Sequence, residues 1–182
     1  MFAIDWVKLE DGASFSGSGA RNEDYFAFGE DLLAVADGHV VFVSDALPDN
    51  VPFPSPAPQH TGDSSGNQIV LEIAPGVYAI YAHVQQGSAQ VRAGDIVHTG
   101  DVLGKLGNSG SADGTDAPHL HFQLSDGPDL MTSTSLPYVI DTWTLEGSTS
   151  PERDTTDLLV APSPVPQSHT LPLEGSVASF AE

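Results

Sequence analysis

The pattern of apolar residues along this chain limits it to a β fold. No segment repeats apolar residues at helical spacing over the roughly eleven residues that would predict a helix. Short β-branched and aromatic runs instead alternate with turns, as in residues 2–9, 31–45, 68–84 and 118–124. The 18 glycines and 14 prolines supply those turns. We therefore predict an all-β fold, a compact antiparallel sheet or sandwich with long loops.

The turn residues also predict which strands are neighbours and where the domain ends. Residues 31–45 predict a hairpin around Asp37-Gly38, and residues 68–84 predict a second one around Pro75-Gly76. Residues 46–67 contain five prolines without periodicity, which predicts a long surface loop. We expect one domain over residues 1–147. Residues 148–182 are rich in Pro, Ser and Thr, and we expect a weakly structured tail that could end in an edge strand.

The charge of the chain excludes several classes of partner. With 25 acidic residues against 5 basic ones, the formal net charge is −20. Contact with nucleic acid needs Lys and Arg, so we expect no nucleic-acid partner and no binding to anionic membrane surfaces. No apolar run approaches the roughly 18 residues of a membrane span. A strand is predicted directly after the first residue, so we expect no signal peptide in this chain. The chain has no cysteine, hence no disulfide and no thiolate ligand.

Four residues are candidates for chemistry. His119 and His121 stand two apart in the apolar segment "APHLHFQL". In a strand they share one face, so one imidazole can bind a metal while the other reaches water held by that metal. Two ordinary core histidines are the alternative. His83, in "YAHV", is a candidate general base. Asp5, in "AIDW", is a carboxylate in an apolar strand, which if buried must be hydrogen-bonded, paired or metal-bound.

The order of these segments resembles that of the LytM-type zinc metallopeptidases, peptidase family M23. The resemblance runs from about residue 2 to residue 143, and it is strongest in "YAHVQQGSAQVRAGDIVHTGDVLGKLGNSG" and "PHLHF". It implies a duplicated hybrid motif with a narrow groove over a central antiparallel sheet. It also implies an endopeptidase that hydrolyses peptide bonds in peptidoglycan cross-bridges or stem peptides. The location that it implies is extracellular or in the cell envelope.

The resemblance also assigns roles to the four candidate residues. It implies one zinc ion, bound by Asp5, which matches the Asp of the family's HxxxD motif, and by His121, the second His of HxH. His83 and His119 match the two catalytic histidines.

The metal site departs from the family pattern at one position. The HxxxD motif needs His four residues before Asp5, where this chain has Met1. A thioether is a poor zinc ligand, and catalytic zinc usually has three protein ligands. Met1 could replace a native residue, another side chain could supply the third ligand, or the site could be degenerate. The candidate substitutes are His39, Asp24 and Asp116, each also explained as an ordinary loop or turn residue.

Two functions therefore stay open. The first is a zinc-dependent endopeptidase acting on peptidoglycan peptide. The second is a degenerate LytM-like module that binds cell-wall peptide or regulates a partner wall hydrolase. The retained His83, His119 and His121 favour the enzyme, whereas the missing ligand favours the module. A biotinyl or lipoyl carrier is disfavoured, because neither Lys8 nor Lys105 stands in a Met-Lys-Met turn.

Overall fold

The all-β prediction is confirmed. The computed structural model describes residues 2–52, 64–110, 117–149 and 158–180. Within these ranges the regular elements are twelve strands and one turn of 3-10 helix, η1. In chain order they are β1 (Ala3–Trp6), η1 (Asn22–Asp24), β2 (Asp31–Leu33), β3 (Gly38–Ser44), β4 (Gln68–Ala74), β5 (Val77–Ala82), β6 (Ile96–Val97), β7 (Val102–Lys105), β8 (Leu120–Ser125), β9 (Ser135–Leu136), β10 (Ile140–Thr149), β11 (Leu158–Thr170) and β12 (Ser176–Ser179). No helix in the described part of the chain is long and apolar enough to span a membrane.

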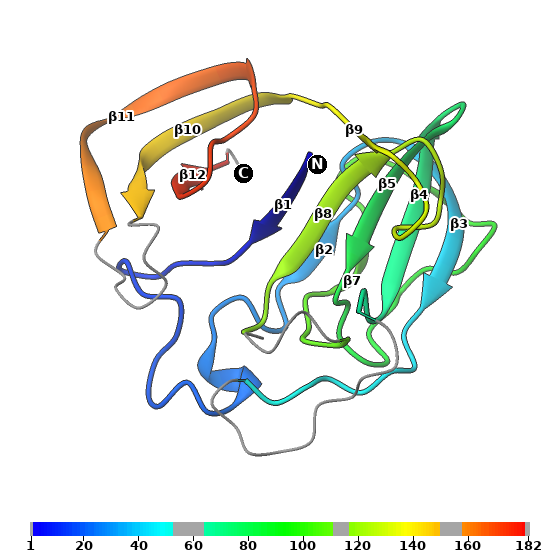
Figure 1. The fold of residues 1–182 in the computed structure, drawn as a ribbon, viewed down its shortest axis with the longest axis horizontal. Coiled ribbons are helices and arrows are strands. Elements are labelled where there is room, and N and C mark those ends of the chain that lie inside the picture. The colour runs from blue at the N-terminus through cyan, green and yellow to red at the C-terminus, as the bar shows by residue number, and fades with distance from the viewer. Residues whose placement is uncertain (1, 53–63, 111–116, 150–157, 181–182) are drawn as a thin grey trace. The chain divides into compact units, whose positions relative to one another are not determined.

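The largest sheet has seven antiparallel strands. Its order is β1-β8-β5-β4-β3-β6, with β9 paired to the end of β8. Figure 1 shows β1, β8, β5, β4 and β3 side by side. The first strand of the chain therefore lies beside the eighth, and this sheet edge carries the "AIDW" and "PHLHF" segments. A smaller antiparallel pair joins β2 and β7.

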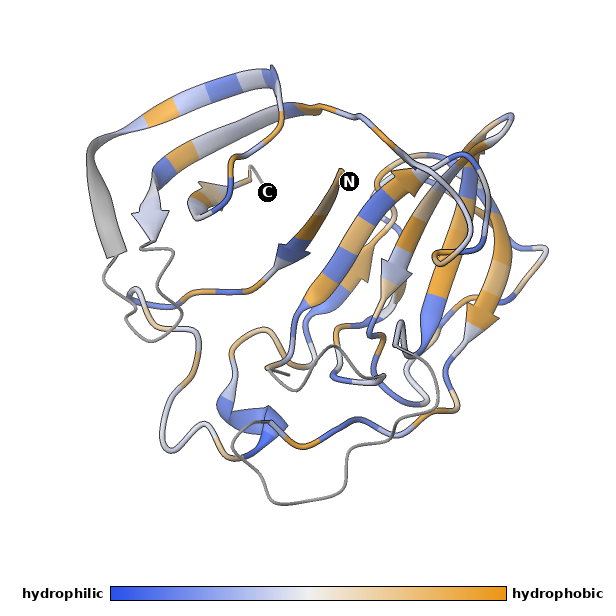
Figure 2. Cartoon of the chain, viewed as in Figure 1, coloured by the Kyte–Doolittle hydropathy of each residue, from blue (hydrophilic) through white to orange (hydrophobic). Residues whose placement is uncertain are grey.

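The core of this sheet lies in β4 and β5. The first four residues of β4 and the last four of β5 are buried in unbroken runs rather than in alternation, which indicates that both faces of the sheet are covered there. Figure 2 shows a hydrophobic stretch along β4 and another along the neighbouring strand β3. The Tyr81 ring packs edge-on against Phe122 with centroids 5.2 Å apart. Its hydroxyl accepts a hydrogen bond from the Val35 N–H. The phenol is thus a satisfied core group.

One predicted hairpin is confirmed and the other is wrong. β4 and β5 form an antiparallel hairpin around Pro75-Gly76. β2, in contrast, pairs with β7, and β3 pairs with β4 and β6. The Asp37 carboxylate accepts hydrogen bonds from the backbone N–H and hydroxyl of Thr99. The Asp37-Gly38 turn is therefore bonded to the segment that leads into β7, and it does not fold β2 onto β3.

The chain divides into two compact units. One comprises Met1–Glu10 and Ser14–Leu136, and the other Asp11–Ala13 and Pro137–Glu182. In the second unit β10 pairs with β11 on one side and β12 on the other. The C-terminal segment that we expected to be weakly structured thus contributes β11 and β12 to a three-stranded sheet with β10, and β12 is the predicted edge strand. The division into a domain of residues 1–147 and a tail stays a prediction, but β10 runs across that boundary.

Candidate metal centre

The sheet edge formed by β1 and β8 brings the four candidate residues together. Asp5 and His121 lie directly opposite each other in the β1–β8 register, so their side chains share a face. Asp5 Oδ1 lies 2.9 Å from His121 Nδ1. His119 directly precedes β8, and His83 directly follows β5, the other neighbour of β8. The His83 ring centroid lies 4.5 Å from that of His119 and 6.3 Å from that of His121.

His83 is held in an unusual backbone conformation. Its φ of 61° lies in the left-handed region, which is uncommon for a residue other than glycine and is concentrated at functional sites. Backbone hydrogen bonds fix it there, since its N–H donates to Ser65 and its carbonyl accepts from Gly107. The turn ends β5 and presents a buried imidazole, 6% exposed, beside His119.

Backbone carbonyls define the proton positions on two rings. His83 Nδ1 donates to the Ser109 carbonyl at 2.7 Å, and His119 Nδ1 donates to the Ala117 carbonyl at 2.9 Å. A neutral imidazole carries one N–H, so the neutral form of each ring, with its proton on Nδ1, has an unprotonated Nε2. Burial, together with the nearby His119 charge, lowers the pKa of His83 to about 4. His83 is therefore neutral near pH 7 and can accept a proton at Nε2.

Asp5 and His121 stabilise each other's charged forms. The hydrogen bond from His121 lowers the pKa of Asp5 more than burial raises it. Burial lowers the pKa of His121, but the hydrogen bond and charge of Asp5 outweigh it, and the net pKa is raised. The Asp5 side chain is 63% exposed and that of His121 is 16% exposed. The pair is thus open to solvent on the Asp5 side, where a ligand could enter.

A buried polar network supports the Ser109 carbonyl. The Ser109 hydroxyl donates to the Val84 carbonyl at 2.7 Å and accepts from the Asn67 N–H at 3.0 Å. The Asn67 amide also donates to Val84. Asn67 and Ser109 are at most 1% exposed. Their hydrogen bonds hold the segment after β7 against the residue that follows His83, so the acceptor for the His83 ring is fixed by the core.

Asp49 fixes the same segment from the other side. Its carboxylate accepts the Asn108 N–H at 2.6 Å and the Gln86 N–H at 3.1 Å. Burial raises the pKa of Asp49, although the two N–H donors lower it. A Cβ at Gly107 would lie 2.5 Å from Asp49 Oδ1, so only glycine allows this approach.

Ser109 and Asp49 were not found from the sequence. Ser109 acts on His83 through its backbone carbonyl, which leaves no side-chain signature. Asp49 lies in a proline-rich segment, where an aspartate is typical of an ordinary turn.

Gly66 permits the closest backbone approach beneath the site. At φ 62° its added Cβ would lie 2.2 Å from the Ser109 carbonyl oxygen. We expect Gly66→Ala to lower the free energy of unfolding by about 2–4 kcal/mol, because it adds a backbone clash to an unfavourable φ. The measurement is denaturant unfolding of the whole chain. The matched control is Gly87→Ala, since Gly87 has φ 69° and nothing within 4 Å. We expect that variant to lose about 1 kcal/mol, and equal losses in the two would contradict the clash.

Asp5 and His121 fit a metal ion as a pair of donors. Two ligands of a tetrahedral zinc stand about 3.3 Å apart, so the observed 2.9 Å contact needs only a small opening to admit the ion. A carboxylate and an imidazole are also donors that zinc accepts. Within the described ranges, however, no group of three or more His, Cys, Asp or Glu is arranged to hold a metal ion.

Two of the proposed substitute ligands lie elsewhere or are engaged. Through the sheet register, His39 pairs with Glu72, Glu72 with Tyr78 and Tyr78 with Ser125. His39 is therefore at the far end of the strands from His121, and two strands lie between β3 and β8, a separation of about 14 Å.

The Asp24 carboxylate is hydrogen-bonded to residues of its own loop. It accepts hydrogen bonds from the Arg21 guanidinium at 3.0 Å, the Ala20 N–H at 3.1 Å and the Ser18 hydroxyl at 3.2 Å. Met1 and Asp116 lie outside the described residues.

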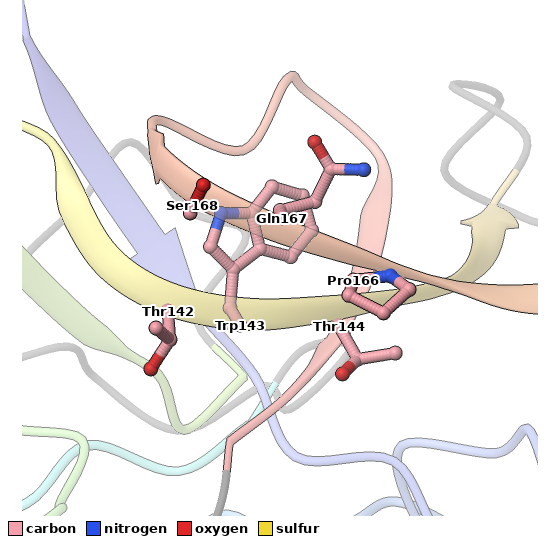
Figure 3. Close-up of a pocket in the computed structure, with 6 residues that line it drawn as sticks. All are labelled: Thr142, Trp143, Thr144, Pro166, Gln167 and Ser168. Atoms are coloured by element: carbon pink, nitrogen blue, oxygen red, sulfur yellow. The ribbon is translucent and has the colours of Figure 1, made fainter.

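A surface depression in the second unit is unrelated to these four residues. It has a volume of about 310 Å³, and its lining residues come from β10 and β11 (Figure 3). They are Thr142, Trp143, Thr144, Pro166, Gln167 and Ser168. None of these lining residues is a histidine or a carboxylate. The candidate site therefore remains the four residues at the edge formed by β1 and β8. The groove implied by the family resemblance stays a prediction.

Solved structures that are similar to this chain include two catalytic domains. The catalytic domain of lysostaphin from Staphylococcus simulans is 22% identical, with a TM-score of 0.43, and the match covers 66% of this chain and 81% of that one. A variant catalytic domain of the prophage-encoded M23 protein EnpA from Enterococcus faecalis is 20% identical, with a TM-score of 0.43, covering 68% and 84%.

Sequence comparison gives the family. Endolysin 2638A of Staphylococcus phage 2638A is 47% identical over 59 residues, which are 32% of this chain and 12% of that endolysin. The chain thus matches only a small part of this relative. The family model of peptidase family M23 matches residues 23–131, more than half of the chain and a range that includes three of the four candidate site residues. The chain belongs to peptidase family M23.

Proposed function

We propose that this chain is a zinc-dependent endopeptidase that hydrolyses peptide bonds in peptidoglycan cross-bridges or stem peptides. The observation that carries the proposal is the convergence of Asp5, His83, His119 and His121 at one sheet edge. Membership of peptidase family M23 supports it. Such a substrate places the enzyme outside the cell or in the cell envelope.

Each residue has a separate task in this proposal. Asp5 Oδ1 and His121 Nδ1 would hold the zinc ion. When bound, zinc polarises the scissile carbonyl and lowers the pKa of its water to about 7. In their neutral forms His83 and His119 present unprotonated Nε2 atoms, which would take a proton from the attacking water and return it to the leaving amine. The buried Ser109 carbonyl keeps the His83 ring in the required tautomer.

The proposal is tested on the whole chain with purified peptidoglycan. We expect about one zinc per chain and the release of amino groups from peptidoglycan. A chelator should stop this release, and added zinc should restore it. Equal release with and without the chelator would contradict zinc dependence, and release of reducing sugars alone would contradict peptide-bond cleavage.

Position 1 is the proposed site of the third ligand. We expect Met1→His, made behind a few added residues, to raise zinc affinity and peptidoglycan hydrolysis by about a hundredfold or more, because an imidazole there would complete the family's HxxxD motif. Zinc competition with a chelator and initial rates of hydrolysis measure the two effects. The control is the same extension with Met1 retained. Tight zinc binding and full activity in that control would mean that another side chain supplies the ligand, which Asp116→Ala would then test.

A second candidate function is a non-catalytic module that binds wall peptide or regulates a partner hydrolase. It is favoured by the lack of a three-residue metal group within the described ranges. Sedimentation of the chain with peptidoglycan, without release of amino groups in either the original or the Met1→His chain, would establish this function instead.

A further inference from the structure

His121 is contacted at both ring nitrogens. Nδ1 faces Asp5 Oδ1 at 2.9 Å, and Nε2 faces Gln123 Oε1 at 3.3 Å. The two contacts lie on opposite sides of the imidazole and so set its rotation about the Cβ–Cγ bond. A ring turned by half a revolution would lose both, because carbon atoms would then face the two oxygens.

Gln123 is well placed to hold this orientation. It lies two residues after His121 in β8, on the same face of the strand. It is 2% exposed, and β8 is flanked at this position by β1 and β5, through Ala3 and Ile80. Its amide does not ionise, so Oε1 remains a hydrogen-bond acceptor at every pH at which the chain is folded.

We infer that Gln123 is a positioning residue, which holds the Nε2–H of His121 and thereby makes Nδ1 the metal-binding atom. The inference rests on the proposed role of His121 as a zinc ligand. An imidazole that binds a metal through one nitrogen keeps its proton on the other, and an acceptor for that proton fixes the tautomer and the ring orientation. Without it, the ring must be ordered at the moment of binding.

The test uses variants that differ in whether an acceptor reaches His121. Gln123→Met keeps the length of the side chain but removes the amide. Gln123→Asn keeps the amide but shortens the side chain by one methylene, and it carries the test if the Met variant does not fold. Gln123→Glu keeps an acceptor at full length. Gln68→Met is the matched control, because Gln68 is also buried but donates to Ser65 and makes no contact with His121.

Zinc affinity of the whole chain is the first readout. We expect Gln123→Met and Gln123→Asn to weaken zinc binding by about ten- to a hundredfold. We expect the zinc affinity of Gln123→Glu and of Gln68→Met to stay close to that of the unsubstituted chain. Unchanged affinity in both Gln123→Met and Gln123→Asn, in which no amide oxygen reaches His121, would overturn the inference and leave the proposed function intact. Failure of the unsubstituted chain to bind zinc would overturn the proposed function itself.

The second readout is the position of the proton on the zinc-loaded ring. Long-range ¹H–¹⁵N spectra of the zinc-loaded chain report which imidazole nitrogen carries a proton. We expect His121 Nε2 to carry it in the unsubstituted chain and in Gln123→Glu, and its resonance to shift or broaden in Gln123→Met. A zinc-loaded His121 without a proton on Nε2 would overturn the inference, whatever the zinc affinities are.

Discussion

His83→Ala is expected to lower peptidoglycan hydrolysis by about a hundredfold or more while zinc remains bound. The variant removes a neutral imidazole whose Nε2 can accept a proton, and a positioned general base contributes about 10²–10⁴ to the rate. Initial rates of amino-group release and the zinc content of the purified protein measure the two quantities. The matched control is His98→Ala, since the His98 side chain is 73% exposed in a turn. Full activity in His83→Ala would remove His83 from the catalytic pair.

The backbone at position 83 gives the same experiment a second readout. Because φ is 61°, alanine is strained there and glycine is not. We therefore expect His83→Gly to be more stable than His83→Ala by about 1 kcal/mol, although both are inactive. Denaturant unfolding measures the difference. Equal stability would mean that the backbone relaxes out of the left-handed region once the imidazole is gone.

His121→Ala is expected to lower zinc affinity by about a hundredfold or more, and His119→Ala to leave it nearly unchanged. Zinc sites with four protein ligands gain about 10–16 kcal/mol, so one ligand contributes about 3 kcal/mol, or two orders of magnitude. His121 Nδ1 lies beside the Asp5 carboxylate, whereas the Nδ1 of His119 is engaged by a carbonyl. Chelator competition measures the affinities.

Both variants should lose hydrolysis, so activity alone does not separate their roles. Asp5→Ala is the companion variant and should resemble His121→Ala in zinc affinity. Equal retention of zinc by His119→Ala and His121→Ala would contradict the assignment of His121 as the ligand.

The sequence was sufficient for properties that depend on neighbouring residues. Runs of β-branched and aromatic residues between turns predicted the all-β fold, because strand geometry is set by local side-chain preference. The Pro75-Gly76 hairpin followed from a turn between two adjacent runs. The side-by-side placement of Gln123 and His121 also follows from the two-residue period of a strand, although only the structure shows that they are in contact.

Pairings between distant segments were decided by the tertiary structure. Asp5 and His121 are 116 residues apart, and only the β1–β8 register places them opposite each other. The strand registers also place His39 at the far end of the strands from His121. The partner of β2 is β7 and not β3. The left-handed turn at His83 depends on backbone partners in two other segments, and the tautomer of its ring depends on the Ser109 carbonyl. Local patterns cannot specify such contacts, because backbone groups are chemically alike in every residue and the choice of partner depends on how the whole sheet packs.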